Sequence, residues 1–344
     1  MPITSDLSID VSKFSAQNID EATKRANAQL ADMTTNAPRW EDIGAETLRA
    51  IQDTGEGSDV PPPVRLPNAV ETTVPSREKD RDIPIRAFKP ENGQPSRGVM
   101  LHFHGGGFVF GSHQHYDTLL KTYADTCQLT AISVGYRLAP EHPFPAAVND
   151  CIDAAEYMVD NAVREYGAPL LFLSGESAGG YLSAVSALQL MRSRPSHSLA
   201  GLVLQYGVYD LALGLPAAST STKPFMINFD IMSGFAKAFL PDMSISDRRD
   251  PRVSPLYEDL KGLVADPATG AALPPAIFMC GTEDPLIDDT IMMSVKWSVA
   301  GGEGIVKIYP GAAHGFTGMP GLPVGDEANA VAVQFVQEKL AGLA

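Results

Sequence analysis

Short apolar runs alternate with longer segments of helical pattern along most of the chain, and no other feature restricts the fold as strongly. The apolar runs predict strands at Val99–Phe103, Ala131–Gly135, Leu170–Ser174, Leu202–Tyr206, Ala276–Cys280 and Ile305–Tyr309. Helices are predicted between or after them, at Tyr116–Thr126, Ala146–Tyr166, Ala178–Met191, from about Asp289, and at Glu327–Leu340. Strands that are apolar on both faces and separated by helices predict an α/β fold, in which helices cover both sides of a mostly parallel sheet.

Three regions lie outside this alternation. The runs Val70–Val74 and Ile83–Phe88 predict an antiparallel hairpin at a sheet edge, which raises the sheet to about eight strands. The first 60 residues predict helices, including one over Trp40–Ile51, and end in turn residues and a run of prolines. Between Tyr206 and Ala276 no strong strand is predicted. An aromatic helical segment there either packs in the core or forms a lid over a pocket, and it contains Phe225, Phe229, Ile231, Met232, Phe235 and Phe239.

Charge and composition exclude several classes of protein. The chain has 344 residues and a net charge of −15, without the cluster of Lys and Arg that nucleic-acid binding requires. Its start lacks the pattern of a secretory signal, and no apolar run reaches membrane-spanning length. Cys127, Cys151 and Cys280 lie far apart in apolar stretches, without metal-ligand spacing, which predicts buried reduced thiols. We therefore expect a cytoplasmic protein with no stable membrane anchor, no nucleic-acid partner and no metal site.

The sequence Gly175-Glu176-Ser177-Ala178-Gly179 joins a predicted buried strand to a predicted helix. Small residues on both sides of Ser177 allow a tight turn that holds the serine in a strained backbone conformation. The N-terminus of the following helix favours negative charge at the same place. In this setting the G-x-S-x-G pattern is that of a nucleophile elbow in an α/β-hydrolase fold, so Ser177 is the candidate nucleophile.

The run His104-Gly105-Gly106-Gly107 directly follows another predicted strand. Acyl transfer places negative charge on a carbonyl oxygen, and backbone amides surround such an oxygen best where no side chains intervene. We expect the oxyanion hole to be formed by the amides of Gly106 and Gly107 together with that of Ala178. The run lacks the Gly-Lys-Ser/Thr ending of a phosphate-binding loop. His104 is expected to brace this loop by hydrogen bonding.

A serine nucleophile needs a base held in the correct tautomer by a third group. Among seven histidines, His314 lies in the loop after the last predicted strand, where it can reach the strand ends. The acid is expected after the preceding strand, where Asp284 precedes a turn-forming proline. Glu283 remains an alternative, whereas Asp288 and Asp289 are expected to cap the next helix. The order Ser177, Asp284, His314 is that of the α/β-hydrolase fold.

Taken together, these motifs resemble the hormone-sensitive-lipase-like esterases, also called bacterial family IV. The resemblance extends from His102 to His314 and rests on the glycine run at 104–107, the run Tyr136–Ala147, the elbow at Ser177, Asp284-Pro285-Leu286 and His314-Gly315-Phe316. One residue departs from the pattern, because the family more often has Asp or Thr at the position of Glu176. This longer carboxylate beside the nucleophile is expected either to alter the hydrogen bonding of the elbow and the pH optimum, or to be satisfied by nearby backbone.

The resemblance implies an eight-stranded α/β-hydrolase with a helical cap, no cofactor, and hydrolysis of short- to medium-chain acyl esters through an acyl-enzyme. The chain then divides into residues 1–60, the N-terminal part of the cap; 61–209, the first part of the catalytic domain; 210–264, the cap insertion; and 265–344, the rest of the catalytic domain. The expected partner is a small-molecule ester, and family members often dimerise through the edge strand, here Ile305–Tyr309. Two alternatives stay open: a non-catalytic ligand-binding member of the fold, and an amide, lactone or carbamate hydrolase with the same residues.

Overall fold

The computed structural model describes residues 6–58, 61–269 and 272–343. The first five residues, where we expect no secretory leader, and the expected boundary at residues 59–60 lie outside these ranges. Eight strands form one sheet in the order β1-β2-β4-β3-β5-β6-β7-β8. Their bounds are β1 Val70–Pro75, β2 Asp82–Phe88, β3 Val99–Phe103, β4 Thr130–Val134, β5 Leu170–Glu176, β6 Gly201–Gln205, β7 Ala276–Gly281 and β8 Gly304–Tyr309. The predicted eight-stranded, mostly parallel sheet is confirmed, because only the pairs β1–β2 and β2–β4 are antiparallel.

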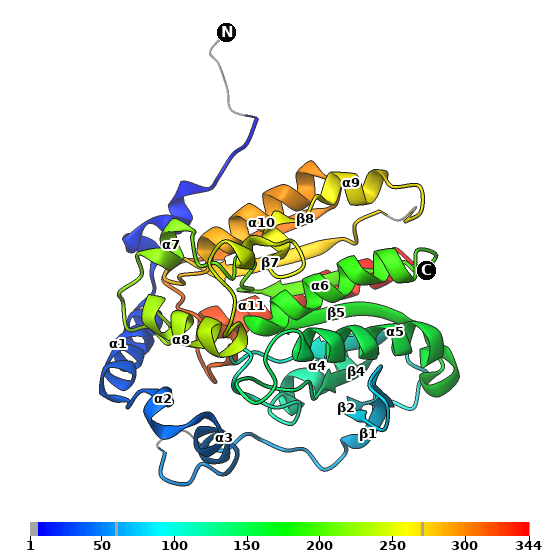
Figure 1. Cartoon of the computed structure of the whole chain (residues 1–344), viewed down its shortest axis with the longest axis horizontal. Helices are drawn as coiled ribbons and strands as arrows, with labels where there is room; N and C mark the ends of the chain where they lie inside the picture. Colours follow the sequence, from blue (N-terminus) through cyan, green and yellow to red (C-terminus); the bar gives the residue numbers. More distant parts are fainter. Residues whose placement is uncertain (1–5, 59–60, 270–271, 344) are drawn as a thin grey trace.

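Helices cover both faces of this sheet (Figure 1). The longer helices are α1 Glu21–Asn36, α3 Ala45–Thr54, α4 Asp117–Cys127, α5 Ala146–Tyr166, α6 Ala178–Ser193, α8 Phe229–Phe239, α10 Ile287–Val299 and α11 Pro323–Ala341, and the short ones are α2 Trp40–Ile43, α7 Pro216–Ser219 and α9 Leu260–Ala265. One core cluster joins the sheet to α5, α6 and α10, and a second joins it to α4 and α11. Strands β3 to β7 are buried along their whole length, which explains why their sequences read as continuous apolar runs.

The prediction of one helix over Trp40–Ile51 is wrong. Gly44 has a φ of +90°, a conformation that glycine adopts more readily than other residues, and its amide donates a hydrogen bond to the carbonyl oxygen of Trp40. The chain therefore turns at Gly44, between α2 and α3.

The region between β6 and β7 has no strand among its described residues, as expected. Its aromatic helix, α8, begins at Phe229, because the side chain of Asn228 caps it by accepting a hydrogen bond from the amide of Ile231. Phe225 was predicted within this helix but lies before it, in a bridge with Ile227. The ring of Phe239 is fully buried and stacks on Phe108, which places the end of α8 over the glycine run.

Strand β8 forms one edge of the sheet and is only partly buried. Val306 on this strand and Met292 and Val299 on the neighbouring α10 expose large apolar side chains. The homodimer through this edge and the domain boundaries expected above stay predictions. Among the residues that the structure describes, no helix is both long and apolar enough to cross a membrane. The three cysteines are buried and unbridged, as predicted.

Candidate active site

Ser177 occupies a sharp turn between β5 and α6. Its φ of 54° and ψ of −117° are strained for a residue with a side chain, and its amide is held by the carbonyl oxygen of Gln205 at 2.9 Å. A Cβ atom added at Gly179 would lie 1.7 Å from the carbonyl oxygen of Phe103, and one at Gly175 would also meet backbone atoms within 2.5 Å. Only glycine therefore fits at both positions, and this close packing against β3 fixes the turn.

Residues from three separate loops converge beside this serine. Nε2 of His314 lies 2.9 Å from Oγ of Ser177, and Nδ1 of the same ring lies 2.8 Å from Oδ2 of Asp284. The second carboxylate oxygen, Oδ1, accepts a hydrogen bond from the amide of Leu286 at 2.8 Å. The ring of Tyr206 meets the imidazole edge-on, with 4.8 Å between centroids. The three residues predicted for the triad thus form one continuous hydrogen-bonded series.

The glycine run lies against the elbow, and its backbone is sharply turned. A Cβ added at Gly105 would lie 3.6 Å from Cβ of Ser177. The carbonyl oxygen of Gly106 accepts hydrogen bonds from the amides of Val109 and Phe110. Within the described residues, the amides of Gly106, Gly107 and Ala178 donate no hydrogen bond to the chain. These amides are therefore available to a ligand oxygen.

His104 is buried under this loop. Its Nδ1 lies 2.8 Å from the carbonyl oxygen of Gly105, its ring stacks on Tyr136 at 4.2 Å, and the hydroxyl of Tyr136 donates to the carbonyl oxygen of His104 at 2.6 Å. Burial lowers the pKa of His104 to about 3, so its ring remains neutral near pH 7. These contacts suit a brace for the loop better than a general base.

Glu176 makes a contact that its position in the sequence does not predict. Its Oε2 lies 2.9 Å from Nε2 of His102, and Nδ1 of His102 lies 3.0 Å from the hydroxyl of Ser133, so the carboxylate is satisfied by a side chain and not by nearby backbone. All three residues are buried. The parallel register pairs His102 with Ser174, which leaves Glu176 two residues further along the same face of β5. The only indication of this contact in the sequence is that His102 is a polar residue within the otherwise apolar run Val99–Phe103.

The other carboxylates near Asp284 bind elsewhere. Glu283 forms an ion pair with Lys223 at the surface. The expectation that Asp288 and Asp289 cap their own helix is wrong, because the N-cap residue of α10 is Leu286 and has no side-chain cap. Asp289 instead accepts hydrogen bonds from the amides of Tyr209 and Asp210, and Asp288 accepts one from Ala217. Both aspartates therefore hold the chain segment that leaves β6, which lies far from them in sequence.

Asp289 provides a test of stability against pH. Burial raises its pKa from the ordinary 3.8 to about 8, so the folded chain keeps a proton that the unfolded chain releases. Its contribution is complete below about pH 4 and is lost as the pH rises towards 8, with a limiting slope of about 1.4 kcal/mol per pH unit. Asp289→Asn should flatten this decline in the free energy of unfolding, measured by urea titration from pH 5 to 9. Asp288→Asn, the control, should leave the slope unchanged; equal slopes in the wild type and Asp289→Asn would contradict the prediction.

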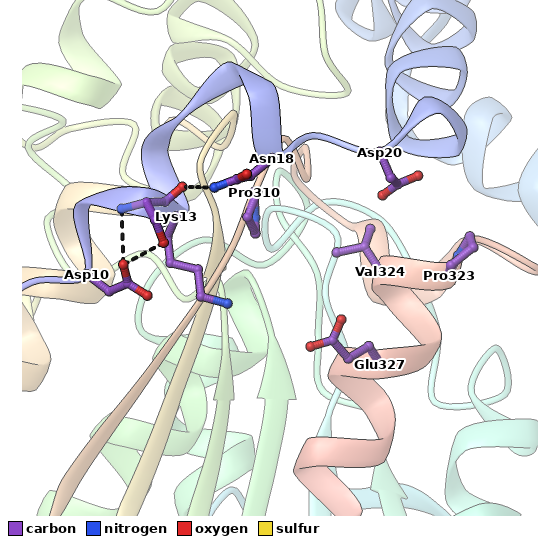
Figure 2. Close-up of a pocket in the computed structure, with 9 residues that line it drawn as sticks. Asp10, Lys13, Asn18, Asp20, Pro310, Pro323, Val324 and Glu327 are labelled. Carbon is purple, nitrogen blue, oxygen red and sulfur yellow. Dashed lines mark hydrogen bonds between the residues drawn. The ribbon is translucent and has the colours of Figure 1, made fainter.

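A separate pocket of about 510 Å³ lies between the N-terminal segment and the start of α11 (Figure 2). Asp10, Lys13 and Asp20 line it from the N-terminal segment, and Glu327 lines it from α11. The side chain of Asn18 also lines it and donates a hydrogen bond to the carbonyl oxygen of Ser12. None of the residues that line this pocket belongs to the series around Ser177.

The fold and this site have clear relatives. A family model described as alpha/beta hydrolase fold matches residues 100–318, and the chain belongs to this family. It is 30% identical over 259 residues to carboxylesterase NlhH of Mycobacterium tuberculosis, which covers 74% of this chain and 78% of that protein. It is also 30% identical over 262 residues to ethyl acetate hydrolase of Pseudomonas putida, with 75% and 79% covered.

A solved structure agrees with these sequence relatives. The hyperthermophilic esterase from the archaeon Pyrobaculum calidifontis matches with a TM-score of 0.77 and 28% identity, over 95% of this chain and 99% of that one. The predicted membership in the hormone-sensitive-lipase-like esterases is confirmed.

Proposed function

We propose that this protein is a carboxylesterase that hydrolyses short- to medium-chain acyl esters through Ser177, His314 and Asp284, with an acyl-enzyme intermediate. The enzyme belongs to the serine carboxylic-ester hydrolases, the class of its relatives. One observation carries the proposal. A strained serine is hydrogen-bonded to a histidine, the histidine to a buried carboxylate, and unpaired amides adjoin them.

The reaction has two steps, acylation of Ser177 and hydrolysis of the acyl-enzyme. Oγ of Ser177 attacks the acyl carbonyl carbon while Nε2 of His314 takes its proton, and the amides of Gly106, Gly107 and Ala178 stabilise the negative oxygen. Collapse of this intermediate breaks the ester C–O bond, and His314 returns the proton to the departing alcohol. Water, deprotonated by His314, then attacks the acyl carbonyl carbon, the bond between that carbon and Oγ of Ser177 breaks, and His314 returns the proton to Oγ as the carboxylic acid is released. Asp284 orients the imidazole and stabilises its cation throughout.

The cap supports the choice of small esters. Phe235 on α8 lies so close to Gly107 that an added Cβ would be 2.4 Å from its ring, and Trp40 from α2 stacks on the same phenyl ring at 5.9 Å. Both parts of the proposed cap thus adjoin the oxyanion loop with aromatic side chains. Apolar walls favour uncharged acyl groups, and their closeness to the reacting centre limits chain length. The relative named ethyl acetate hydrolase has a small ester in its name.

A panel of p-nitrophenyl esters from acetate to palmitate tests this proposal. We expect the highest kcat/KM between acetate and octanoate, and a decline of about 10-fold or more at palmitate, because an acyl chain longer than the space between the aromatic walls and the reacting centre must displace those walls to bind. Matched p-nitroanilides serve as the control for amide hydrolysis and should react far more slowly. Maximal activity on palmitate or on the anilides would overturn the substrate assignment. A chain inactive on every ester would overturn the function itself.

A further inference from the structure

Arg49 connects the N-terminal helices to the catalytic body. It lies on α3, and its side chain reaches away from that helix to three acceptors. Nε donates to the carbonyl oxygen of Val109 at 2.7 Å, and Nη2 donates to the carbonyl oxygen of Ala139 at 2.5 Å and to Oε2 of Glu141 at 2.8 Å. Two of these acceptors are backbone atoms more than fifty residues away in the sequence. A planar guanidinium is suited to such a group of contacts because its donors have fixed directions.

The carbonyl groups of Val109 and Ala139 both lie in chain segments that hydrogen-bond to the oxyanion loop or form part of it. The amide of Val109 donates to the carbonyl oxygen of Gly106 at 3.0 Å, so the contact of Arg49 lies one peptide beyond that turn. The amide of Ala139 donates to the carbonyl oxygen of Phe108 at 2.9 Å, which joins the same loop to its neighbour. Arg49 therefore binds two chain segments whose own hydrogen bonds hold the loop that contains Gly106 and Gly107.

The surroundings of α2 and α3 reinforce this connection. The rings of Trp40, Phe110 and Phe235 form a cluster with centroids 5.6 to 5.9 Å apart, and Phe110 belongs to the oxyanion loop. Asp53 on α3 lies 3.2 Å from Nε2 of His115, beyond the other end of that loop. The N-terminal helices thus contact the loop along its length, through these rings and through the hydrogen bonds of Arg49 and Asp53.

We propose that Arg49 is a positioning residue for ester hydrolysis, which fixes the amides of Gly106 and Gly107 from the cap through the carbonyl groups of Val109 and Ala139. This inference rests on the proposed function. The N-terminal helices then form part of the catalytic apparatus and do more than cover the substrate. Loss of Arg49 weakens stabilisation of the oxyanion, which is absent from the bound ground-state ester and develops as Ser177 attacks, so it lowers kcat more than it raises KM.

Arg49→Ala tests the proposal, with Arg39→Ala as the matched control. Arg39 lies in the same segment, but its side chain is largely exposed and, among the described residues, hydrogen-bonds to Glu41 and not to the oxyanion loop. With p-nitrophenyl butyrate we expect Arg49→Ala to lower kcat about 10- to 100-fold with KM changed less than about threefold, because small displacements of catalytic groups are costly. Added guanidinium at millimolar concentration should restore part of kcat in Arg49→Ala only. Hydrogen exchange at the amides of Val109 and Phe110 should accelerate in Arg49→Ala and not in Arg39→Ala.

The outcomes separate the two proposals. Slow exchange and unchanged kcat in Arg49→Ala would overturn the positioning role while leaving ester hydrolysis intact. An inactive wild type would overturn the proposed function, and the exchange at Val109 and Phe110 would still report whether Arg49 holds the loop. A fall in kcat that guanidinium does not restore, accompanied by a fall in the thermal midpoint of Arg49→Ala, would indicate a general structural role and contradict the proposal. If Arg49→Ala does not fold, Arg49→Lys should fold and lower kcat about fivefold, because one ammonium cannot reproduce the fork; full activity in that variant would overturn the proposal.

Discussion

Ser177→Ala should lower kcat for p-nitrophenyl butyrate by about 10⁴-fold or more, because the acyl-enzyme cannot form without the serine oxygen. The methyl group that remains fits the elbow, so the variant should fold with an unchanged thermal midpoint. A fluorophosphonate probe should label the wild type at Ser177 and leave the variant unlabelled. The same measurement addresses the non-catalytic alternative, since a pure ligand-binding protein should not react with the probe.

Ser186→Ala provides the matched control, on the helix that directly follows Ser177. The hydroxyl of Ser186 is buried and has no hydrogen-bond partner among the described residues, so its removal should leave kcat within about threefold and labelling intact. Ester hydrolysis that persists in Ser177→Ala at the wild-type rate would show that the nucleophile is elsewhere. Equal losses in both serine variants would point to damage to the helix and would also contradict the assignment.

Asp284→Asn should lower kcat by a similar amount, about 10⁴-fold, while the protein stays folded. An asparagine amide can donate a hydrogen bond to Nδ1 of His314, which places the ring proton on Nε2. In that tautomer Nε2 cannot accept the proton of Ser177. The measurements are kcat and the rate of labelling by the fluorophosphonate probe, and both should fall together because each depends on the nucleophile.

Glu283→Gln is the control, since this neighbouring carboxylate was the alternative acid. Glu283 bonds to Lys223 at the surface and not to His314, so its substitution should change kcat by less than about threefold. If instead Glu283→Gln proves as damaging as Asp284→Asn, the acid has been assigned to the wrong residue.

The strands were largely predictable from the sequence because their signal is local. Five strands buried on both faces must be apolar at nearly every position, and turn residues bound them. Helix boundaries were less predictable where a single residue decided them. Gly44 divides an apolar helical pattern by its backbone conformation, and Asn228 starts α8 by a side-chain cap. Neither event changes the hydrophobic periodicity on which the predictions depended.

In the candidate site, too, some residues could be predicted from the sequence and others could not. Ser177 and the glycines could be selected from the sequence, because a nucleophile elbow and a turned oxyanion loop need small residues at fixed spacing. The partners of Glu176 and Arg49 could not. His102 meets Glu176 only because β3 and β5 are neighbours in the sheet, although 74 residues separate the two side chains. Arg49 likewise depends on how the N-terminal helices lie against the body.

From the sequence alone follow the α/β class, the elbow at Ser177 and the order in which its partners occur, because strand burial and tight turns impose local residue patterns. The tertiary structure alone decided which carboxylate among Glu283, Asp284, Asp288 and Asp289 meets His314, and that two of the others hold the segment leaving β6. Whether distant residues form a hydrogen bond depends on differences of a few tenths of an ångström in the distance between donor and acceptor. Such distances are determined by the packing of whole elements, which no local pattern encodes.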